Sequence, residues 1–155
     1  MNVLITGASG AQAYKLEKEI SNAHTIIFAD SFDLPAAMLK SRKFIKIPED
    51  SSVSFSHQLL TICLDLNIQQ VFPLRRLEIR ALAEARQLFD EYGIKVMVPA
   101  QGDLDKYFGT YKSGTLLIKD AGQQSGAHDQ TSSIDRGAFL LNTGAEPELQ
   151  ILTVD

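Results

Sequence analysis

The chain has 155 residues, of which 45% are hydrophobic and 22% charged, a balance typical of a soluble globular protein. Its formal net charge is −4 and it has no basic run, so we expect no nucleic-acid partner. The single cysteine, Cys63, excludes an internal disulfide framework, and no apolar stretch is long enough to span a membrane. The N-terminus begins directly with a strand pattern and carries no secretory signal, so we expect a cytoplasmic protein.

The N-terminal segment combines a buried strand, a glycine turn and a helix start. Residues 2–6 form an apolar run that ends at Gly7 and Gly10. The helix that follows places its apolar residues on one face, at the helical spacing of Ala13, Leu16, Ile20 and Ala23. This arrangement directs backbone N–H groups and a helix N-terminus at one point, where an anion can bind.

Strand and helix signals alternate up to about residue 99. The predicted strands cover residues 2–6, 25–30, 43–48, 68–74 and 94–98. The predicted helices after the first cover residues 36–40 (a short turn after Pro35), about 55–66 and 77–92. Alternation of this kind predicts a Rossmann-like, three-layer α/β/α fold with a five-stranded, mostly parallel sheet and right-handed crossovers.

Local signals refine three of these elements. The strand at 43–48 alternates polar and apolar residues, which predicts a position at the sheet edge. Ser51, Ser52 and Ser54 offer hydroxyls to cap the helix that follows them. Gly93 is a suitable residue to end the helix predicted at 77–92.

The composition changes from Ala100 onward, where Gly, Ser, Gln and Asp become frequent. Apolar runs at 115–119, 138–142 and 149–154 predict an antiparallel ribbon of two or three strands. We expect the polar stretch at 120–133 to be mobile. The chain is therefore divided into a Rossmann-like domain, residues 1–100, and a small β-rich appendage, residues 101–155.

The glycine turn is the main candidate for a cofactor site. Gly7, Ser9 and Gly10 would face a phosphate group, and Asp30, at the end of the second strand, would accept hydrogen bonds from ribose hydroxyls. Ala13 stands where the dinucleotide-binding fingerprint has its third glycine, so the match is incomplete. ATP and NAD(P) are the candidate ligands; the alternative is that the turn is only a sharp corner between strand and helix.

A lysine and a group of three arginines are further candidates for anion-binding residues. Lys119 lies at a strand end before a Gly- and Ser-rich loop, a place where a lysine can contact phosphate; the alternative is a solvated lysine. Arg75, Arg76 and Arg80 follow the fourth strand, at the edge where open α/β sheets bind ligands. They would hold an anion there, or pair with neighbouring acids such as Glu78 and Glu84.

Catalytic and metal-ligating residues are not predicted. His24, His57 and His128 are far apart in the sequence and show no metal-ligand spacing. The chain also lacks the Gly-x-Ser-x-Gly motif of a nucleophilic serine.

Residues 2 to about 100 resemble the N-terminal, pre-ATP-grasp domain of ATP-grasp enzymes such as the carbamoyl-phosphate synthase large chain and related carboxylate–amine ligases. The segments that carry the resemblance are Val3–Gly7, Phe28–Asp30, Pro35–Ala37, Phe44–Pro48, Leu59–Cys63, Ile68–Pro73, Leu82–Ala83 and Phe89–Val96. In the appendage, Asp105–Lys106 is similar to the start of the ATP-grasp domain proper, and Leu117–Lys119 to its strand with an ATP-contacting lysine. The resemblance implies that Lys119 would contact ATP.

The chain departs from that family in its final part. The resemblance implies that a complete enzyme would add a late cluster of acids and an Asn that hold magnesium, and the sequence stops at Asp155 before such a cluster. We therefore expect a shortened ATP-grasp relative that does not catalyse ligation alone and acts as a binding or association module. Because a short ribbon has open edges, we expect a homodimer.

Two alternatives stay open at this point. The chain could be a nucleotide- or dinucleotide-binding protein that uses the turn at Gly7–Gly10. It could instead be one half of a split ATP-dependent carboxylate–amine ligase, completed by a separate ATP-grasp chain.

Overall fold

A computed structural model describes residues 1–20, 24–36, 43–110, 114–120, 135–142 and 148–155. Five parallel strands form the first sheet, in the order β3-β2-β1-β4-β5. They are β1 (Asn2–Ile5), β2 (Thr25–Asp30), β3 (Lys43–Lys46), β4 (Ile68–Phe72) and β5 (Lys95–Val96). The predicted parallel α/β fold is confirmed, and β3 lies at a sheet edge as its alternating pattern predicted.

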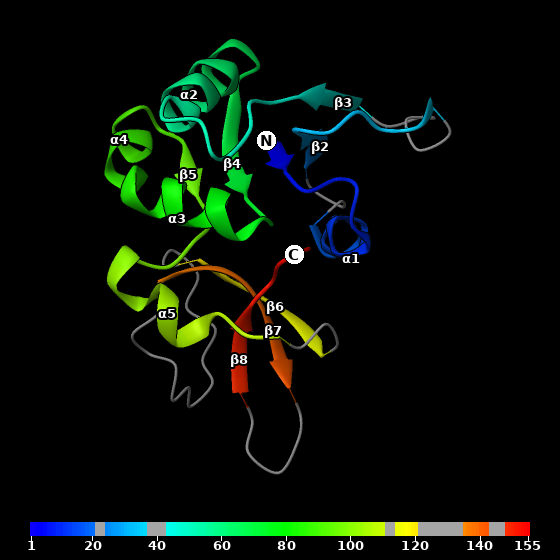
Figure 1. Cartoon of the computed structure of the whole chain (residues 1–155), viewed down its shortest axis with the longest axis vertical. Coiled ribbons are helices and arrows are strands. Elements are labelled where there is room, and N and C mark those ends of the chain that lie inside the picture. The colour runs from blue at the N-terminus through cyan, green and yellow to red at the C-terminus, as the bar shows by residue number, and fades with distance from the viewer. Residues whose placement is uncertain (21–23, 37–42, 111–113, 121–134, 143–147) are drawn as a thin grey trace.

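Helices cover both faces of this sheet (Figure 1). They are α1 (Ala11–Ile20) on one face, and α2 (Phe55–Asp65), α3 (Arg76–Glu84) and α4 (Arg86–Glu91) on the other. Alternate residues of β1 explain the layers: Val3 and Ile5 pack in one apolar cluster with Leu16 of α1, and Leu4 packs in the other with Phe55 of α2.

The structure corrects several predicted boundaries. The helix predicted at 77–92 is two helices, because the backbone turns at Ala85, although Leu82 and Phe89 still both reach the core. The fourth strand ends at Phe72, since Pro73 has no N–H for the sheet. The fifth is shorter because the Val98 N–H bonds the Val96 carbonyl instead of a neighbouring strand.

The helix ends test two predicted caps. Gly93 has a φ of +74° and donates its N–H to the Asp90 carbonyl, so its predicted role at the end of α4 is confirmed. The predicted serine cap of α2 is wrong. Ser54 stands at the N-cap position, but its hydroxyl contacts Ser52 and Gln58 instead of a backbone N–H of the helix.

A second, antiparallel sheet follows two short helical turns, in the order β6-β7-β8. These elements are η2 (Gln101–Asp103), α5 (Leu104–Tyr107), β6 (Thr115–Asp120), β7 (Arg136–Asn142) and β8 (Glu148–Ile151). The predicted ribbon is confirmed, whereas the turns η2 and α5 were not predicted from apolar periodicity. The short helix expected at 36–40 and the mobile stretch expected at 120–133 lie outside the described residues, except Ala36 and Asp120.

The second sheet packs onto the carboxyl-terminal edge of the first (Figure 1). Ala138 and Leu140 of β7 join the cluster of Val3 and Leu16, while Phe139 joins the cluster of Phe55. Both faces of β7 are therefore buried, and the two sheets share their apolar core.

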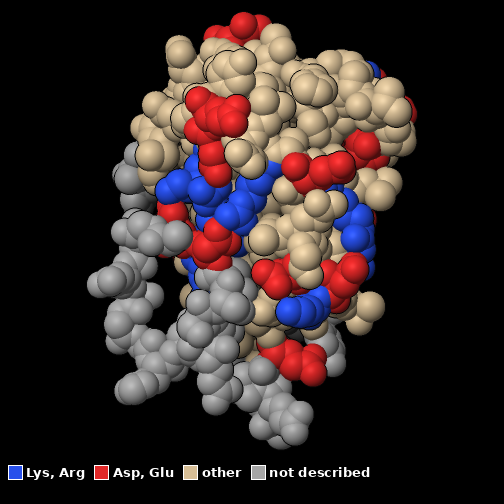
Figure 2. Space-filling model, turned by 90° about the vertical axis from the view of Figure 1, so that its left-hand side faces the viewer, with Lys and Arg blue, Asp and Glu red and all other residues tan. Residues whose placement is uncertain are grey.

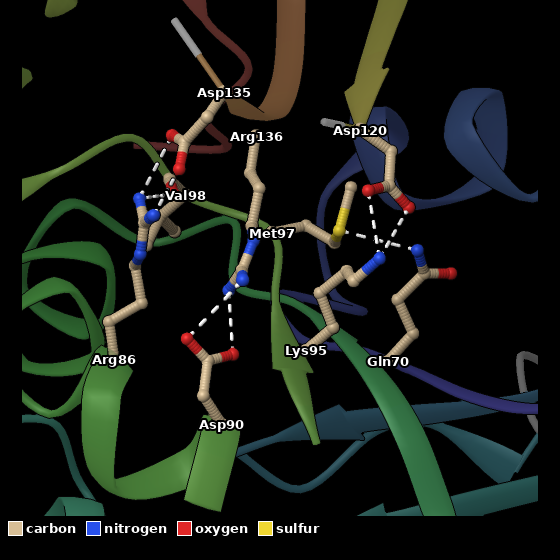
Figure 3. Close-up of polar contacts among 9 residues, drawn as sticks. All are labelled: Gln70, Arg86, Asp90, Lys95, Met97, Val98, Asp120, Asp135 and Arg136. Carbon is tan, nitrogen blue, oxygen red and sulfur yellow. Dashed lines mark hydrogen bonds and ion pairs between the residues drawn. The ribbon is translucent and has the colours of Figure 1, made fainter. Parts of the chain in front are cut away.

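Ion pairs reinforce this packing along α4 and β5 (Figure 3). Arg86 pairs with Asp135 and also donates to the Val98 carbonyl at 3.1 Å. Two further pairs run from Arg136 to Asp90 at 2.8 Å and from Lys95 to Asp120 at 2.8 Å. The start of β7 is thus held against α4, and the end of β6 is held against β5.

Candidate functional site

The glycine turn has the predicted geometry. Gly7, directly after Thr6 and β1, has a φ of +65°, a conformation that favours glycine. The Gly10 N–H closes the turn on the Gly7 carbonyl at 2.9 Å, and α1 begins at Ala11. A strand, a tight turn and a helix N-terminus therefore meet here as the sequence predicted.

The side chain of Val154 occupies the space over this turn. A Cβ atom at Gly10 would lie 2.6 Å from Val154 Cγ1, and one at Gly7 would lie 2.9 Å from Val154 Cγ2. The Val154 N–H donates to the Leu74 carbonyl at 2.8 Å, which fixes residue 154 beside the end of β4. Both glycines therefore permit close approach of the chain's own apolar residue.

Asp30 is fully buried and bound by protein groups. Arg75 Nη2 lies 3.1 and 3.0 Å from its two carboxylate oxygens, and the Ser9 N–H donates to Oδ2 at 3.0 Å. Burial opposes the charge of Asp30, but the hydrogen bonds from Arg75 and Ser9 outweigh it and lower the pKa of this carboxyl. Both oxygens that would bind a ribose already accept hydrogen bonds from the protein.

The structure brings most of the predicted cofactor residues together. Ser9 is exposed beside the turn, and its hydroxyl accepts a hydrogen bond from Arg75 Nη2 at 2.9 Å. Ser9 and Asp30 thus both bind Arg75, beside the turn formed by Gly7 and Gly10. Lys119 belongs to another part of the molecule, because it lies on β6 of the second sheet, opposite Gly137.

Of the arginines after β4, Arg75 and Arg80 form ion pairs with acids, as one of the two interpretations predicted, but the acids are not Glu78 and Glu84. Arg76 contacts Asp155 through its main chain, since its backbone N–H donates to Asp155 Oδ1 at 2.9 Å, and its guanidinium donates to main-chain oxygens of Asp155 and Gly109. Arg80 pairs with Asp105 at 2.8 Å. Figure 2 shows that Lys and Arg side chains lie next to Asp and Glu side chains over the middle and lower part of one face.

Glu78 is buried, whereas the sequence predicted a solvated helix face for it. Thr6 Oγ1 donates to Glu78 Oε2 and accepts the Leu74 N–H at 2.9 Å. Glu78 Oε1 has no hydrogen-bond partner within the described chain, and burial raises the pKa of Glu78 to about 7. The helical spacing of the sequence could have indicated this burial, because residue 78 lies on the same face of α3 as the buried Leu82, one turn later.

A hollow of about 250 Å³ opens beside Arg75 at the carboxyl ends of β2 and β3. Its lining consists of Ser31, Phe32, Glu49, Asp50 and Arg75. The Arg75 guanidinium lies over the Phe32 ring, 4.9 Å from its centroid. Neither this hollow nor any other part of the described ranges has three or more His, Cys, Asp or Glu residues arranged to hold a metal ion. No helix in these ranges is long and apolar enough to cross a membrane.

Residues 3–97 match the family model described as the PylC-like, N-terminal domain. The chain belongs to this family. The PylC-like N-terminal domain is of the pre-ATP-grasp type, so the resemblance to the N-terminal domain of ATP-grasp proteins is confirmed. This PylC-like domain is accordingly an ATP-grasp-related module, and the match includes the glycine turn and Asp30.

Other comparisons give more distant likenesses. A search of curated proteins gave no match. Among solved structures, MoeE5 in complex with UDP-glucose and NAD is 22% identical, with a TM-score of 0.40 over 74% of this chain and 39% of that one. MoeE5 with UDP-glucuronic acid and NAD is 23% identical, with a TM-score of 0.40 over 74% of this chain and 40% of that one. The PylC-like chain thus spans about two fifths of the length of these structures.

Proposed function

We propose that this chain is a non-catalytic, ATP-grasp-related module that acts by binding or association, and that its glycine turn serves the packing of the molecule. The observation that supports this most directly is the position of Val154. Its side chain packs against both glycines, since Cβ atoms at Gly7 and Gly10 would lie 2.9 and 2.6 Å from it, and we infer that it fills the space that a phosphate group would need.

The electrostatics of the turn support the same proposal. A nucleotide at this turn would need a free acceptor for its ribose and free donors for its phosphates. Asp30 already accepts hydrogen bonds from Arg75 and Ser9. Among the N–H groups of the turn itself, that of Ser9 is bonded to Asp30 and that of Gly10 to the Gly7 carbonyl. Binding a nucleotide here would therefore require these internal contacts to break.

A thermal-shift titration with ATP, NAD and NADP tests the proposal. A ligand present at a hundredfold excess over its dissociation constant stabilises a protein by about 2.7 kcal/mol, which for a chain of this size raises Tm by roughly 5–10 °C. We expect no such shift for the wild-type chain with any of the three nucleotides, with or without magnesium.

The matched variant is Ser9→Asp, which places a carboxylate at the exposed position of the turn without changing the core. A nucleotide shift in the wild type that Ser9→Asp removes would show that the turn binds phosphate. That result would overturn the proposal and favour the nucleotide-binding alternative.

A further inference from the structure

Arg75 connects three elements at the carboxyl-terminal edge of the first sheet. It stands just before α3, and its Nη2 donates to both carboxylate oxygens of Asp30 at the end of β2. The same nitrogen donates to the hydroxyl of Ser9, just before α1, and the guanidinium lies over the ring of Phe32. The Arg75 side chain is only 13% exposed. Its contacts therefore join the glycine turn, the end of β2 and the start of α3.

A second buried acid lies close to the same guanidinium. Glu78 follows Arg75 by three residues, in the first turn of α3, and is fully buried. Burial raises the pKa of Glu78, the positive charge of Arg75 acts against that rise, and the negative charges of Asp50 and Asp30 add to it. Asp155, which follows β8, also attracts Arg75. One buried arginine thus stands between two buried acids, Asp30 and Glu78.

The hydrogen bonds of Glu78 are incomplete in the present arrangement. Thr6 donates to Oε2, whereas Oε1 has no hydrogen-bond partner within the described chain. A neutral carboxyl tolerates such a position far better than a buried carboxylate, which requires a hydrogen-bonded counter-charge. The observed arrangement, in which Arg75 binds Asp30, is therefore the one that suits a protonated Glu78.

We propose that Arg75 is the moving part of a switch: when Glu78 loses its proton, the guanidinium shifts from Asp30 and Ser9 toward Glu78 Oε1. Among the charged groups that act on Glu78, Arg75 is the cation, while Asp30 and Asp50 are anions. The proton passes to solvent, and no covalent bond between heavy atoms changes. The glycine turn and the end of β2 then lose a contact that holds them to α3.

The switch operates near neutral pH. Burial raises the pKa of Glu78 to about 7, so its charge changes around this pH. Burial opposes the charge of Asp30, but the hydrogen bonds from Arg75 and Ser9 outweigh it and lower the pKa of that carboxyl. Asp30 is therefore charged before Glu78 ionises. The inference goes beyond the proposed role in association, because it concerns how the turn is held and involves no ligand or partner.

Two measurements on the full chain at pH 5 and pH 9 test the proposal. NMR spectroscopy of the side-chain carboxyl groups follows the charge of Glu78, and crystal structures show the position of Arg75. We expect the Glu78 carboxyl to titrate with a midpoint near pH 7. We also expect Arg75 on Asp30 at pH 5 and within hydrogen-bond distance of Glu78 Oε1 at pH 9, with at least about a tenfold change in the ratio of the two positions.

Glu78→Gln is the matched variant, because its side chain is neutral at both pH values and should leave Arg75 on Asp30 throughout. Glu84→Gln, an exposed change on the same helix, is the control and should move Arg75 as the wild type does.

An arginine that stays on Asp30 while the Glu78 carboxyl titrates would overturn the proposal. A Glu78 carboxyl that keeps the same charge from pH 5 to pH 9 would overturn it as well. So would an equal movement of Arg75 in Glu78→Gln, because its cause would then be another group. The experiment contains no nucleotide, so its failure is separate from any failure of the proposed function.

Discussion

Glu78 holds a carboxyl group in a fully buried position in the first turn of α3, with one oxygen bound by Thr6 and the other without a partner in the described chain. The Thr6 hydroxyl in turn accepts the Leu74 N–H, and the Leu74 carbonyl accepts the Val154 N–H. A series of hydrogen bonds thus connects the buried Glu78 to Val154, the residue that covers the glycine turn. Such a group makes stability depend on pH.

The pH dependence of Glu78 has a definite sign. Burial raises the pKa of Glu78 from 4.5 to about 7, so the folded chain keeps this proton where the unfolded chain has released it. The contribution of Glu78 to the free energy of unfolding therefore falls as pH rises from about 4.5 through about 7. Glu78→Gln has no proton to lose. At pH 8 its free energy of unfolding should therefore be higher than that of the wild type by up to about 3 kcal/mol.

Urea unfolding at pH 5 and pH 8 measures this difference, which should shrink at the lower pH. Glu84→Gln, an exposed change on the same helix, is the control and should leave the pH dependence unchanged. Equal pH slopes for the wild type and Glu78→Gln would contradict the assignment of a buried, protonated Glu78.

At the scale of the elements, the second sheet is fixed to α4 and β5 by three ion pairs (Figure 3). In the pair of Arg86 with Asp135, Arg86 is 18% exposed and also binds the Val98 carbonyl. Asp135 is 40% exposed, so solvent weakens the pair. The contribution of this pair to stability should be modest but measurable.

Asp135→Asn should lower the free energy of unfolding by about 1 kcal/mol at pH 7, because it leaves the guanidinium of Arg86 without its carboxylate. Burial opposes the charge of Asp135, but the hydrogen bonds from Arg86 outweigh it and lower the pKa of this carboxyl below 3.8. The stabilisation is therefore present above about pH 4 and is lost as pH falls through the lowered pKa.

Urea titrations at pH 7 and pH 3 provide the measurement. Asp33→Asn breaks an ion pair in which Asp33 is 88% exposed, and it should cost no more than a few tenths of a kcal/mol. An Asp135→Asn variant as stable as Asp33→Asn would show that the pair does not hold the second sheet.

The order of the elements could be predicted because it follows from local patterns. Alternating residues placed β3 at an edge, and Gly93 marked the end of α4. The turn at Ala85 and the short helix α5 could not be predicted. Neither segment contains a glycine, a proline or an apolar stripe long enough to mark it. The predicted cap by Ser54 was wrong because its hydroxyl forms hydrogen bonds with the side chains of Ser52 and Gln58.

At the scale of the whole molecule, the two sheets form one packed unit, and the candidate site lies where they meet. The sequence placed Gly7, Ser9, Gly10 and Asp30 at one site, since all four sit at the ends of adjacent strands. It could not place Val154 over the turn, because that contact depends on how the second sheet packs against the first. Long-range packing of this kind leaves no periodic signal in the sequence.

If the glycines of the turn are required because Val154 packs against them, residues 10 and 154 must be energetically coupled, and a double-mutant cycle on Gly10 and Val154 measures that coupling. Gly10→Ala alone should cost about 1–3 kcal/mol, because its Cβ would lie 2.6 Å from Val154 Cγ1. In a Val154→Gly background the same change should cost nothing or stabilise, since Ala suits the start of α1 better than Gly.

Gly102→Ala, where a Cβ meets nothing within 4 Å, controls for the general effect of the substitution. Free energies of unfolding of the wild type, the two single variants and the double variant, all measured in urea, give the coupling energy. We predict a coupling of at least about 1 kcal/mol between residues 10 and 154. A Gly10→Ala cost that is the same with valine or glycine at position 154 would show that Val154 does not require a glycine at position 10.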